Sequence, residues 1–341
     1  MAPTVIHDTT QIDFERPGKT HYQVAFHLDS SWGYSLVPLT VINGTAGGNS
    51  SDLPGVVVFG GTHGNEYEGQ VAVKRLCTDL ESSEMRGRVI LIPQLSETAC
   101  RAHHRRSLED GVNMNRAFPG IARGTLSYRI AHFVKRQIFP QVRVVIDIHS
   151  GGREAVFPLC MSFHPLANPK QHAETLAVAR LFDTPFIFVY SRQMASGLLT
   201  DEAEDEGKVT IGSELGHAEG TNPRGVRHAY EGVRNVLRHY GMLSGEITRI
   251  DPQRPTPPRL VQAPVLADYV PAPRSGIWEP VVAPGDDVQG GDLIGRLHDF
   301  SDHSSPGLEI RAHKTGVVIA MLFAAHCEKG VTLYVIGEDA A

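Results

Sequence analysis

Three short apolar runs constrain the fold of this chain more than any other feature. Runs of Val and Ile without polar alternation are typical of strands buried on both faces, as in parallel sheets. Apolar residues at helical spacing follow the first run. The three runs are Val56–Phe59, Arg88–Pro93 and Val142–His149, and the helical positions are Val71, Ala72, Leu76 and Leu80.

The same alternation of strand and helix patterns continues towards the middle of the chain. Strands are expected at Pro185–Tyr190 and Lys208–Leu215, and helices at Ser127–Phe139 and Arg224–Leu243. This alternation favours an α/β fold with a mixed, largely parallel sheet flanked by helices. In such sheets, chemistry lies at the carboxyl ends of the strands.

The pattern changes after residue 250. Five prolines between Asp251 and Pro264 preclude a continuous helix, so residues 251–264 are interpreted as a linker between domains 1–250 and 265–341. The last segment contains short strand patterns separated by turns, which predicts a small all-β domain. Its sequence PGDDVQGGDLIGRL resembles the hairpins of lipoyl/biotinyl-type barrels. Lys314 lacks the flanking hydrophobes of a carrier lysine, so a cap over the active site is the preferred interpretation.

Composition excludes several classes of protein. The formal net charge of -6 provides no basic footprint for nucleic acid. No apolar run approaches the roughly 18 residues that span a bilayer, and the N-terminal segment does not resemble a signal peptide. The four cysteines form no C-x-x-C pair, which indicates a reducing compartment, with the cytoplasm as the expected location.

The first candidate site follows the strand Val56–Phe59, in the sequence GGTHGNEYEG. His63 and Glu66 are expected in the first helical turn, where residues i and i+3 share a face. An imidazole and a carboxylate so placed can bind one zinc ion, and a catalytic zinc usually has three protein ligands. By itself H-x-x-E is a weak signal, because a surface His and a helix-start Glu give the same pattern.

His149 offers a third ligand. It ends the strand Val142–His149 and is followed by glycines, as His63 is preceded by them. Asp147 could orient a ligand or could serve only as a structural carboxylate.

Polar residues suited to an anionic substrate lie between these segments. Asn115 and Arg116 can hold a carboxylate, which Arg binds with two parallel hydrogen bonds. Arg105 and Arg106 are candidates for polarising a substrate carbonyl, although a pair of surface arginines would look the same. Glu214, at the end of Lys208–Leu215, can take a proton from water and pass it to a leaving amine, or it can be a salt-bridged structural residue.

Taken together, GTHGNEYEG, NMNRAFPG, DIHSGG and SELG resemble the succinylglutamate desuccinylase/aspartoacylase family, over nearly the whole chain. Members are zinc-dependent N-acyl amino acid hydrolases with a zinc-carboxypeptidase-like core. The phrase DGVNMNRAFPG and the helix RGVRHAYEGVRNVL look most like the Nα-acetyl-L-2,4-diaminobutyrate deacetylases of ectoine breakdown.

The resemblance implies roles for individual residues. It implies zinc ligands His63, Glu66 and His149, and Glu214 as general base and then general acid. It implies Asn115 and Arg116 as the site for the substrate α-carboxylate. The carbonyl-polarising arginine corresponds best to Arg105, with Arg106 as a competitor. Leu108 and the pair His217 and Glu219 depart from the subgroup pattern.

The expected activity is therefore hydrolysis that removes a small acyl group, with acetyl preferred, from an N-acyl amino acid. A zinc carboxypeptidase acting on short peptides, a desuccinylase or aspartoacylase type of deacylase, a non-catalytic zinc-binding protein and a zinc-free structural domain remain as alternatives. The sequence leaves open the acyl group, the side chain recognised and whether the chain forms homo-oligomers.

Overall fold

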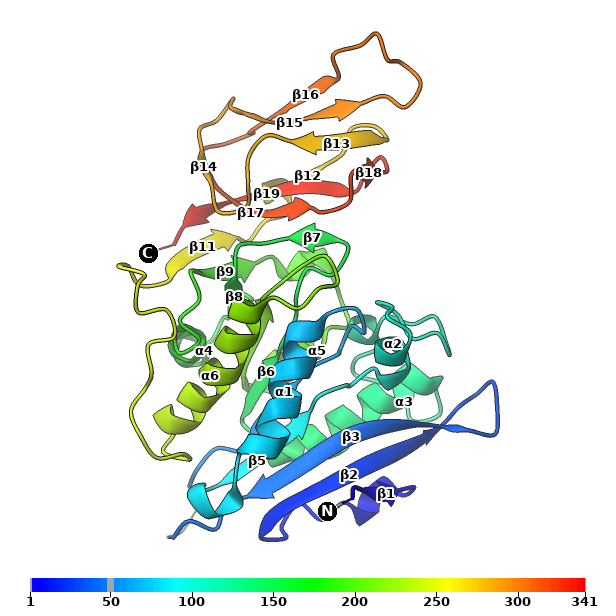
Figure 1. Ribbon diagram of the computed structural model, residues 1–341, viewed down its shortest axis with the longest axis vertical. Helices are drawn as coiled ribbons and strands as arrows, with labels where there is room; N and C mark the ends of the chain where they lie inside the picture. Colours follow the sequence, from blue (N-terminus) through cyan, green and yellow to red (C-terminus); the bar gives the residue numbers. More distant parts are fainter. Residues whose placement is uncertain (1, 48–51, 341) are drawn as a thin grey trace.

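A long mixed sheet runs through the molecule and is flanked by helices in its first two thirds (Figure 1). The computed structural model describes residues 2–47 and 52–340. The strand order is β1-β2-β3-β5-β4-β6-β10-β8-β9-β11, followed by β19 (Thr332–Asp339), β17 (Gly316–Leu322) and β14 (Asp287–Val288). Up to β11, the strands are β1 (Thr4–Ile6), β2 (Gly18–His27), β3 (Tyr34–Asn43), β4 (Val56–Phe59), β5 (Arg88–Ile92), β6 (Val144–Asp147), β7 (Ala155–Val156), β8 (Cys160–Phe163), β9 (Phe186–Tyr190), β10 (Val209–Glu214) and β11 (Arg259–Ala263).

The centre of the sheet is parallel, as the apolar runs predict. β4 pairs in parallel with β5 and with β6, and β6 pairs in parallel with β10, whereas β8 is antiparallel to β10. Alternate residues of β4 face opposite sides: Val56 and Val58 belong to one apolar core, and Val57 and Phe59 to the other. Burial on both faces explains why this strand has no polar alternation.

Helices cover both faces of the central strands. α1 (Tyr67–Asp79), α4 (Pro169–Arg180) and α6 (Pro223–His239) pack on the face of Val56. α3 (Leu126–Phe133) and α5 (Leu199–Asp205) pack on the other face, and the short α2 (Glu97–Arg101) lies beside β3. The predicted helix 127–139 is less regular than expected: after α3 it continues as a π-helical turn, Val134–Ile138, and a 3-10 turn, Phe139–Gln141.

The C-terminal part is all β, as expected, and lies above the α/β part in Figure 1. A second sheet, β16-β15-β13-β18, packs against β12, β14, β17 and β19 around the indole of Trp278, which is 3% exposed. The strands are β12 (Tyr269–Pro271), β13 (Gly276–Pro280), β14 (Asp287–Val288), β15 (Leu293–His298), β16 (Leu308–Arg311), β17 (Gly316–Leu322), β18 (His326–Cys327) and β19 (Thr332–Asp339). The predicted class, a largely parallel α/β sheet plus a β-rich C-terminal part, is confirmed.

The segment 251–264 has two halves. Its proline-rich first half runs as loop, but its second half is β11, which pairs in parallel with β9 and antiparallel with β19. Residues Arg259–Ala263 contain no proline, so their backbone N–H groups are free to pair. One sheet therefore continues from the α/β part into the C-terminal part. Within the described residues, no helix is long and apolar enough to cross a membrane.

Candidate active site

Three polar segments meet at one edge of the parallel sheet. β4, β6 and β10 are adjacent, and they end at Phe59, Asp147 and Glu214. His63 follows the end of β4, and His149 lies two residues beyond β6. Parallel pairing of neighbouring strands brings these ends together, although they are far apart in the chain.

Glycines shape the turn that carries His63. Gly61 has a φ of +64°, which favours glycine, and a Cβ on Gly64 would lie 2.1 Å from the backbone carbonyl carbon of Ala99. His63 and Glu66 precede helix α1 instead of lying in its first turn, because Glu66 has extended φ and ψ at the N-cap. Their side chains meet nevertheless, since the turn 63–66 closes with a bond from Glu66 N–H to His63 O (3.4 Å).

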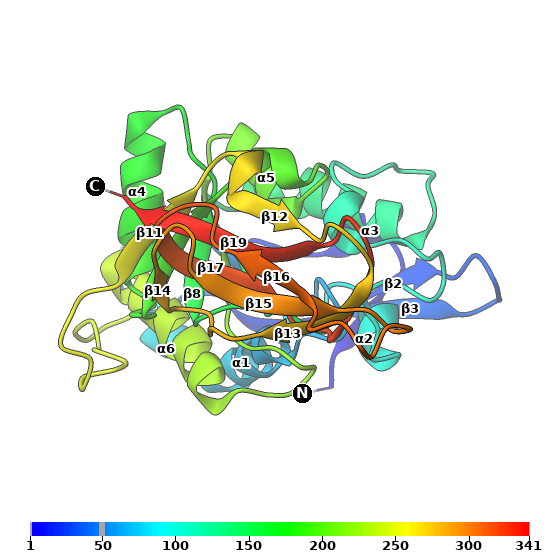
Figure 2. The ribbon, with the colours of Figure 1, turned by 90° about the horizontal axis from the view of Figure 1, so that it is seen from above.

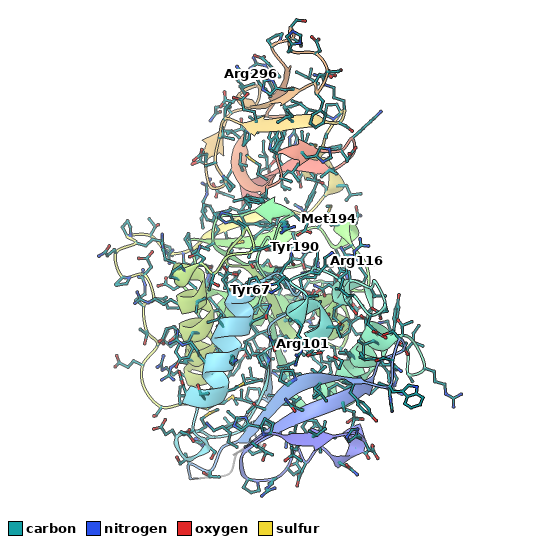
Figure 3. The ribbon with its side chains drawn as sticks, turned by 45° about the vertical axis from the view of Figure 1, so that its right-hand side comes forward. Tyr67, Arg101, Arg116, Tyr190, Met194 and Arg296 are labelled. Atoms are coloured by element: carbon teal, nitrogen blue, oxygen red, sulfur yellow. The ribbon has the colours of Figure 1, made fainter. Side chains whose placement is uncertain are left out.

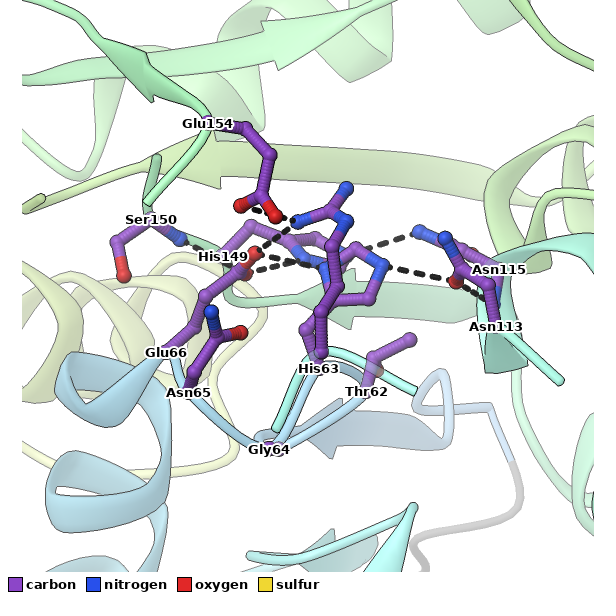
Figure 4. A network of polar contacts seen from close by, with 12 residues as sticks. Thr62, His63, Gly64, Asn65, Glu66, Asn113, Asn115, His149, Ser150 and Glu154 are labelled. Atoms are coloured by element: carbon purple, nitrogen blue, oxygen red, sulfur yellow. Dashed lines mark hydrogen bonds and ion pairs between the residues drawn. The ribbon is translucent and has the colours of Figure 1, made fainter. Parts of the chain in front are cut away.

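The Glu66 carboxylate lies between two imidazoles (Figure 4). Its Oε1 is 2.7 Å from His63 Nδ1, and its Oε2 is 2.8 Å from His149 Nδ1. All three side chains are buried, and their candidate ligand atoms lie within 4.8 Å of one another. Two imidazoles and one carboxylate are the donor set of many catalytic zinc sites, so these residues fit one zinc ion.

Burial and mutual contact shift the pKa values of Glu66, His63 and His149. Burial would raise the pKa of Glu66, but the charges of His63 and His149 hold that pKa well below its usual range. Burial lowers the pKa of His63. The pKa of His149 is well above its usual range, because the carboxylates of Asp147 and Glu66 outweigh the effect of burial.

Further polar residues fix the orientation of the two imidazoles. His149 Nε2 lies 2.7 Å from Asp147 Oδ2, and Asp147 Oδ1 accepts a hydrogen bond from the Thr62 hydroxyl at 2.7 Å. His63 Nε2 lies 3.0 Å from Asn113 Oδ1. Each ring therefore presents Nδ1 to the centre of the site, while its Nε2 contacts a polar side chain that holds the ring in place. This arrangement is common around metal-binding histidines.

Glu214 is a half-buried residue whose carboxylate borders the same cavity. Its Oε2 is fully enclosed and has no hydrogen-bond partner in the described structure. Burial raises the pKa of Glu214 to about 8, and the nearby Glu66 charge adds to the effect. A carboxyl group with a raised pKa can both accept and return a proton near neutral pH.

Two arginines and an asparagine complete the predicted set. Arg105 Nη1 donates to Glu66 Oε1 at 2.8 Å, whereas Arg106 is exposed and does not border the cavity. Asn115 Nδ2 lies 3.2 Å from His149 Nε2, and its Oδ1 accepts from the N–H of Leu199. Burial and the charge of Arg105 lower the pKa of Arg116.

All seven predicted site residues border one cavity of about 620 Å³. They are His63, Glu66, Arg105, Asn115, Arg116, His149 and Glu214. Figure 3 places Arg116, Tyr190 and Met194 just below the C-terminal domain, and all three border the cavity.

The C-terminal domain forms part of the cavity wall. Residues of β17, β18 and β19 contribute, among them Met321, His326 and Tyr334. Seen from above, β13, β15 and β17 lie across the α/β part (Figure 2). The wall from this domain could not be located from the sequence, because it depends on how two separate parts of the chain pack.

His217 and Glu219 lie outside the cavity wall. The His217 ring packs against Phe323, with ring centroids 5.9 Å apart, and Glu219 pairs with Arg153 at 2.5 Å.

The sequence interpretation missed Asn113 and Glu154. Asn113 lies in the same segment as Asn115, so its amide could have been recognised from the sequence as a further candidate site residue. No sequence pattern marks Glu154 as a site residue.

A second buried cluster lies away from this trio. His164 Nδ1 is 2.8 Å from Glu204 Oε2 and 3.7 Å from Asp201 Oδ1, and the His164 ring packs on Tyr190. The three residues could hold a cation by their spacing. The Arg192 guanidinium, 3.6 Å from Asp201, already supplies positive charge there, so a charge network is the simpler interpretation.

Comparison with known proteins assigns the chain to a family. The sequence model of the succinylglutamate desuccinylase/aspartoacylase catalytic domain matches residues 52–240. The N-alpha-acetyl-L-2,4-diaminobutyric acid deacetylase of Halomonas elongata is 33% identical over 332 residues, which are 96% of this chain and 94% of that protein. The chain belongs to the succinylglutamate desuccinylase/aspartoacylase family.

Solved structures extend the family likeness to the whole chain. A succinylglutamate desuccinylase/aspartoacylase from Rhodobacter sphaeroides has a TM-score of 0.90 and 33% identity, covering 97% of this chain and 98% of that one. The product-bound ectoine utilization protein EutE (DoeB) of Ruegeria pomeroyi has a TM-score of 0.87 and 30% identity, covering 96% and 97%. Both alignments include the C-terminal domain, so the family relationship is not limited to residues 52–240.

Proposed function

We propose that this chain is a zinc-dependent amidohydrolase that removes a small acyl group from an N-acyl amino acid. Acetyl is the first candidate for the acyl group, and Nα-acetyl-L-2,4-diaminobutyrate, an intermediate of ectoine degradation, is the first candidate substrate. The Halomonas elongata relative bears the name of this activity, and a second relative is named for ectoine utilization. The observation that carries the proposal is the grouping of His63, Glu66, His149 and Glu214 around one cavity.

His63, Glu66 and His149 would hold the metal through two nitrogens and a carboxylate oxygen. Zinc at such a site acts as a Lewis acid and lowers the pKa of water towards neutrality. Asp147 and Asn113 keep the two imidazoles in place through the bonds to their Nε2 atoms. The protein supplies the remaining chemistry with its own side chains.

Glu214 is the proposed proton carrier. The residue borders the cavity and its Oε2 has no hydrogen-bond partner in the described structure, so the carboxylate is not committed to another residue and would accept a proton from the attacking water. Because burial raises its pKa to about 8, the protonated form is a competent donor to the departing amine. One carboxyl group thus serves both proton transfers of amide hydrolysis.

Arg105 and Arg116 are the proposed anion-binding groups. Arg105, which contacts Glu66, would donate to the acyl oxygen as negative charge develops there. Arg116 and Asn115 would bind the α-carboxylate and orient the amide towards Glu214. Burial and the nearby charge of Arg105 lower the pKa of Arg116, and both effects favour an anion between or beside the two guanidinium groups.

The experiment is a panel assay of the zinc-loaded protein. Release of free amine is measured for Nα-acetyl-diaminobutyrate, Nα-acetyl-aspartate, succinyl-glutamate and unacylated dipeptides. Hydrolysis of acyl amino acids without hydrolysis of dipeptides supports the proposal. Cleavage of dipeptides alone would identify a carboxypeptidase, and zinc binding without any hydrolysis would favour a binding protein.

A further inference from the structure

Glu154 is a carboxylate of the cavity wall that the proposed reaction does not use. Figure 4 shows it extending from its own segment towards the group formed by Glu66 and His149. Its side chain is 50% exposed. Among the described residues, its ion-pair partner is Arg105 Nη1 at 3.5 Å, which is longer than a good hydrogen bond. The carboxylate therefore has free acceptor capacity at the edge of the reaction site.

The backbone around Glu154 is held on both sides. A tight turn bonds the N–H of Glu154 to Gly151 O at 3.0 Å, and Gly152 has a φ of +55°. Strand β7, which starts at the next residue, pairs with β17 of the C-terminal domain. The N–H of Phe323 also donates to Glu154 O at 3.2 Å. A carboxylate on a backbone fixed between two domains is suited to reading the charge of a substrate.

The other carboxylates of the cavity are already committed. Glu66 lies between the imidazoles, and Glu214 is assigned as the proton carrier. Glu328 lies in the C-terminal domain, where it accepts from the Ser275 hydroxyl and pairs with His326. Glu154 is therefore the wall carboxylate that is both available and near the reacting groups.

The cations of the wall are committed as well. Arg105 and Arg116 are assigned to the acyl oxygen and the α-carboxylate, and Arg153 is tied to Glu219 at 2.5 Å. A second carboxylate on the substrate, as in acyl-aspartate or acyl-glutamate, would have to compete with Glu219 for Arg153, the remaining guanidinium among the described wall residues. A positively charged side chain would instead find a carboxylate that lacks a close partner. The charge balance of the wall thus favours a cationic side chain over an anionic one.

We propose that Glu154 is a specificity-determining residue that binds a protonated amino group on the side chain of the N-acyl amino acid. The inference rests on the proposed function. In a 2,4-diamino acid the side-chain nitrogen extends about 4 Å beyond the α-carbon, given bond lengths near 1.5 Å. That reach suits a carboxylate 3.5 Å from Arg105, the residue proposed to hold the neighbouring acyl oxygen. A charge-assisted hydrogen bond of this kind corresponds to about 10-fold to 100-fold in affinity.

The alternative role for Glu154 is to position Arg105. The two roles make different predictions, because loss of a positioning residue weakens catalysis on every substrate. Loss of a residue that binds the substrate's side-chain amine removes the preference for substrates that carry this amine. A pair of substrates that differ only in the amino group therefore separates them.

The test uses the full-length, zinc-loaded protein with Nα-acetyl-L-2,4-diaminobutyrate and Nα-acetyl-L-2-aminobutyrate, which lacks the side-chain amine. We expect wild type to prefer the amine by at least about 10-fold in kcat/KM, and Glu154→Gln to abolish that ratio. Glu328→Gln, which removes another wall carboxylate, is the matched control and should keep the ratio. Zinc content and thermal unfolding verify that each variant is folded and loaded.

Three results would overturn the inference. The first is a wild type with equal kcat/KM for the two compounds. The second is a Glu154→Gln variant that keeps the wild-type preference for the amine. The third is a Glu154→Gln variant whose kcat/KM falls by the same factor for both compounds. Failure of wild type to hydrolyse either compound would count against the proposed function instead. Calorimetric titration of both compounds into wild type and Glu154→Gln would then read the preference from Kd, and equal Kd values in wild type would refute the inference.

Discussion

His149 Nδ1 lies 2.8 Å from Glu66 Oε2, although the two residues are 83 positions apart in the chain. The opposite nitrogen of the ring lies 2.7 Å from Asp147 Oδ2. Asp147 is fully buried and also accepts from the Thr62 hydroxyl. The imidazole therefore cannot turn without breaking a buried polar contact, and Asp147 determines which nitrogen faces the site.

Replacement of Asp147 should weaken metal binding without removing a ligand. We expect Asp147→Asn to lower zinc affinity by about 10-fold to 100-fold, because His149 loses the anion that orients it. Competition with a zinc chelator measures the change. Thr62→Val, which removes only the second contact of Asp147, should have a smaller effect, and wild-type affinity in Asp147→Asn would refute the orienting role.

Glu214 should be dispensable for metal binding and essential for turnover. Glu214→Gln keeps the size of the side chain but cannot carry a proton, so kcat should fall by about 10² to 10⁴ with zinc content unchanged. Glu219→Gln is a matched control, because that carboxylate lies outside the cavity wall and pairs with Arg153. Normal hydrolysis by Glu214→Gln would mean that the base is assigned wrongly.

The raised pKa of Glu214 also predicts a pH-dependent stability of the metal-free protein. Burial raises this pKa from 4.5 to about 8, so between these values the unfolded chain ionises while the folded protein holds the proton. Stability contributed by this group therefore falls as pH rises, by about 1.4 kcal/mol per pH unit across that window. Below pH 4.5 Glu214 is protonated in both the folded and the unfolded protein, and above about pH 8 it is ionised in both, so its contribution is constant outside the window.

Glu214→Gln removes the titration, so its stability relative to wild type should increase from about pH 4.5 to about pH 8 and then level off. Urea unfolding in the presence of a chelator, at several pH values, measures the difference in unfolding free energy. A difference that stays constant with pH would show that Glu214 is not protonated in the folded protein. Zinc should reduce the effect, because positive charge favours the ionised carboxylate.

The sequence was sufficient for the central sheet and for choosing seven residues that prove to border one cavity. Apolar runs such as Val56–Phe59 locate buried strands, and the carboxyl ends of adjacent parallel strands must meet, so the sequence alone groups His63 with His149. The expected i, i+3 geometry was wrong in detail, because Glu66 lies at the N-cap with extended backbone. The two side chains still meet, because the closed turn 63–66 also brings these residues together.

Features that depend on long-range packing were not predictable. Glu154 reaches the cavity because β7 pairs with β17, more than 160 residues later, and no local pattern reports that pairing. The family resemblance favoured Arg105 over Arg106, but no local pattern distinguishes the two, because their positions at the cavity depend on which side chain turns inward. The N-terminal hairpin of β2 and β3 was not predicted, although it extends the sheet beyond β5.

The buried His164–Glu204 pair provides a last prediction, about stability and metal count together. Both side chains are almost fully buried, so Glu204→Ala would leave His164 without its 2.8 Å partner and should cost about 1–3 kcal/mol of unfolding free energy. Asp205→Ala, one residue away, removes only an exposed pair with Arg192 and should cost about 0–1 kcal/mol.

Metal analysis of the same variants distinguishes a charge network from a second metal site. We expect one zinc per chain in wild type, in Glu204→Ala and in Asp205→Ala, and loss of that zinc in His63→Ala. Two zinc ions in wild type, with one lost in Glu204→Ala, would instead assign a cation to His164, Asp201 and Glu204. The charge-network interpretation predicts the single count, because the Arg192 guanidinium lies 3.6 Å from Asp201 and would repel a second cation.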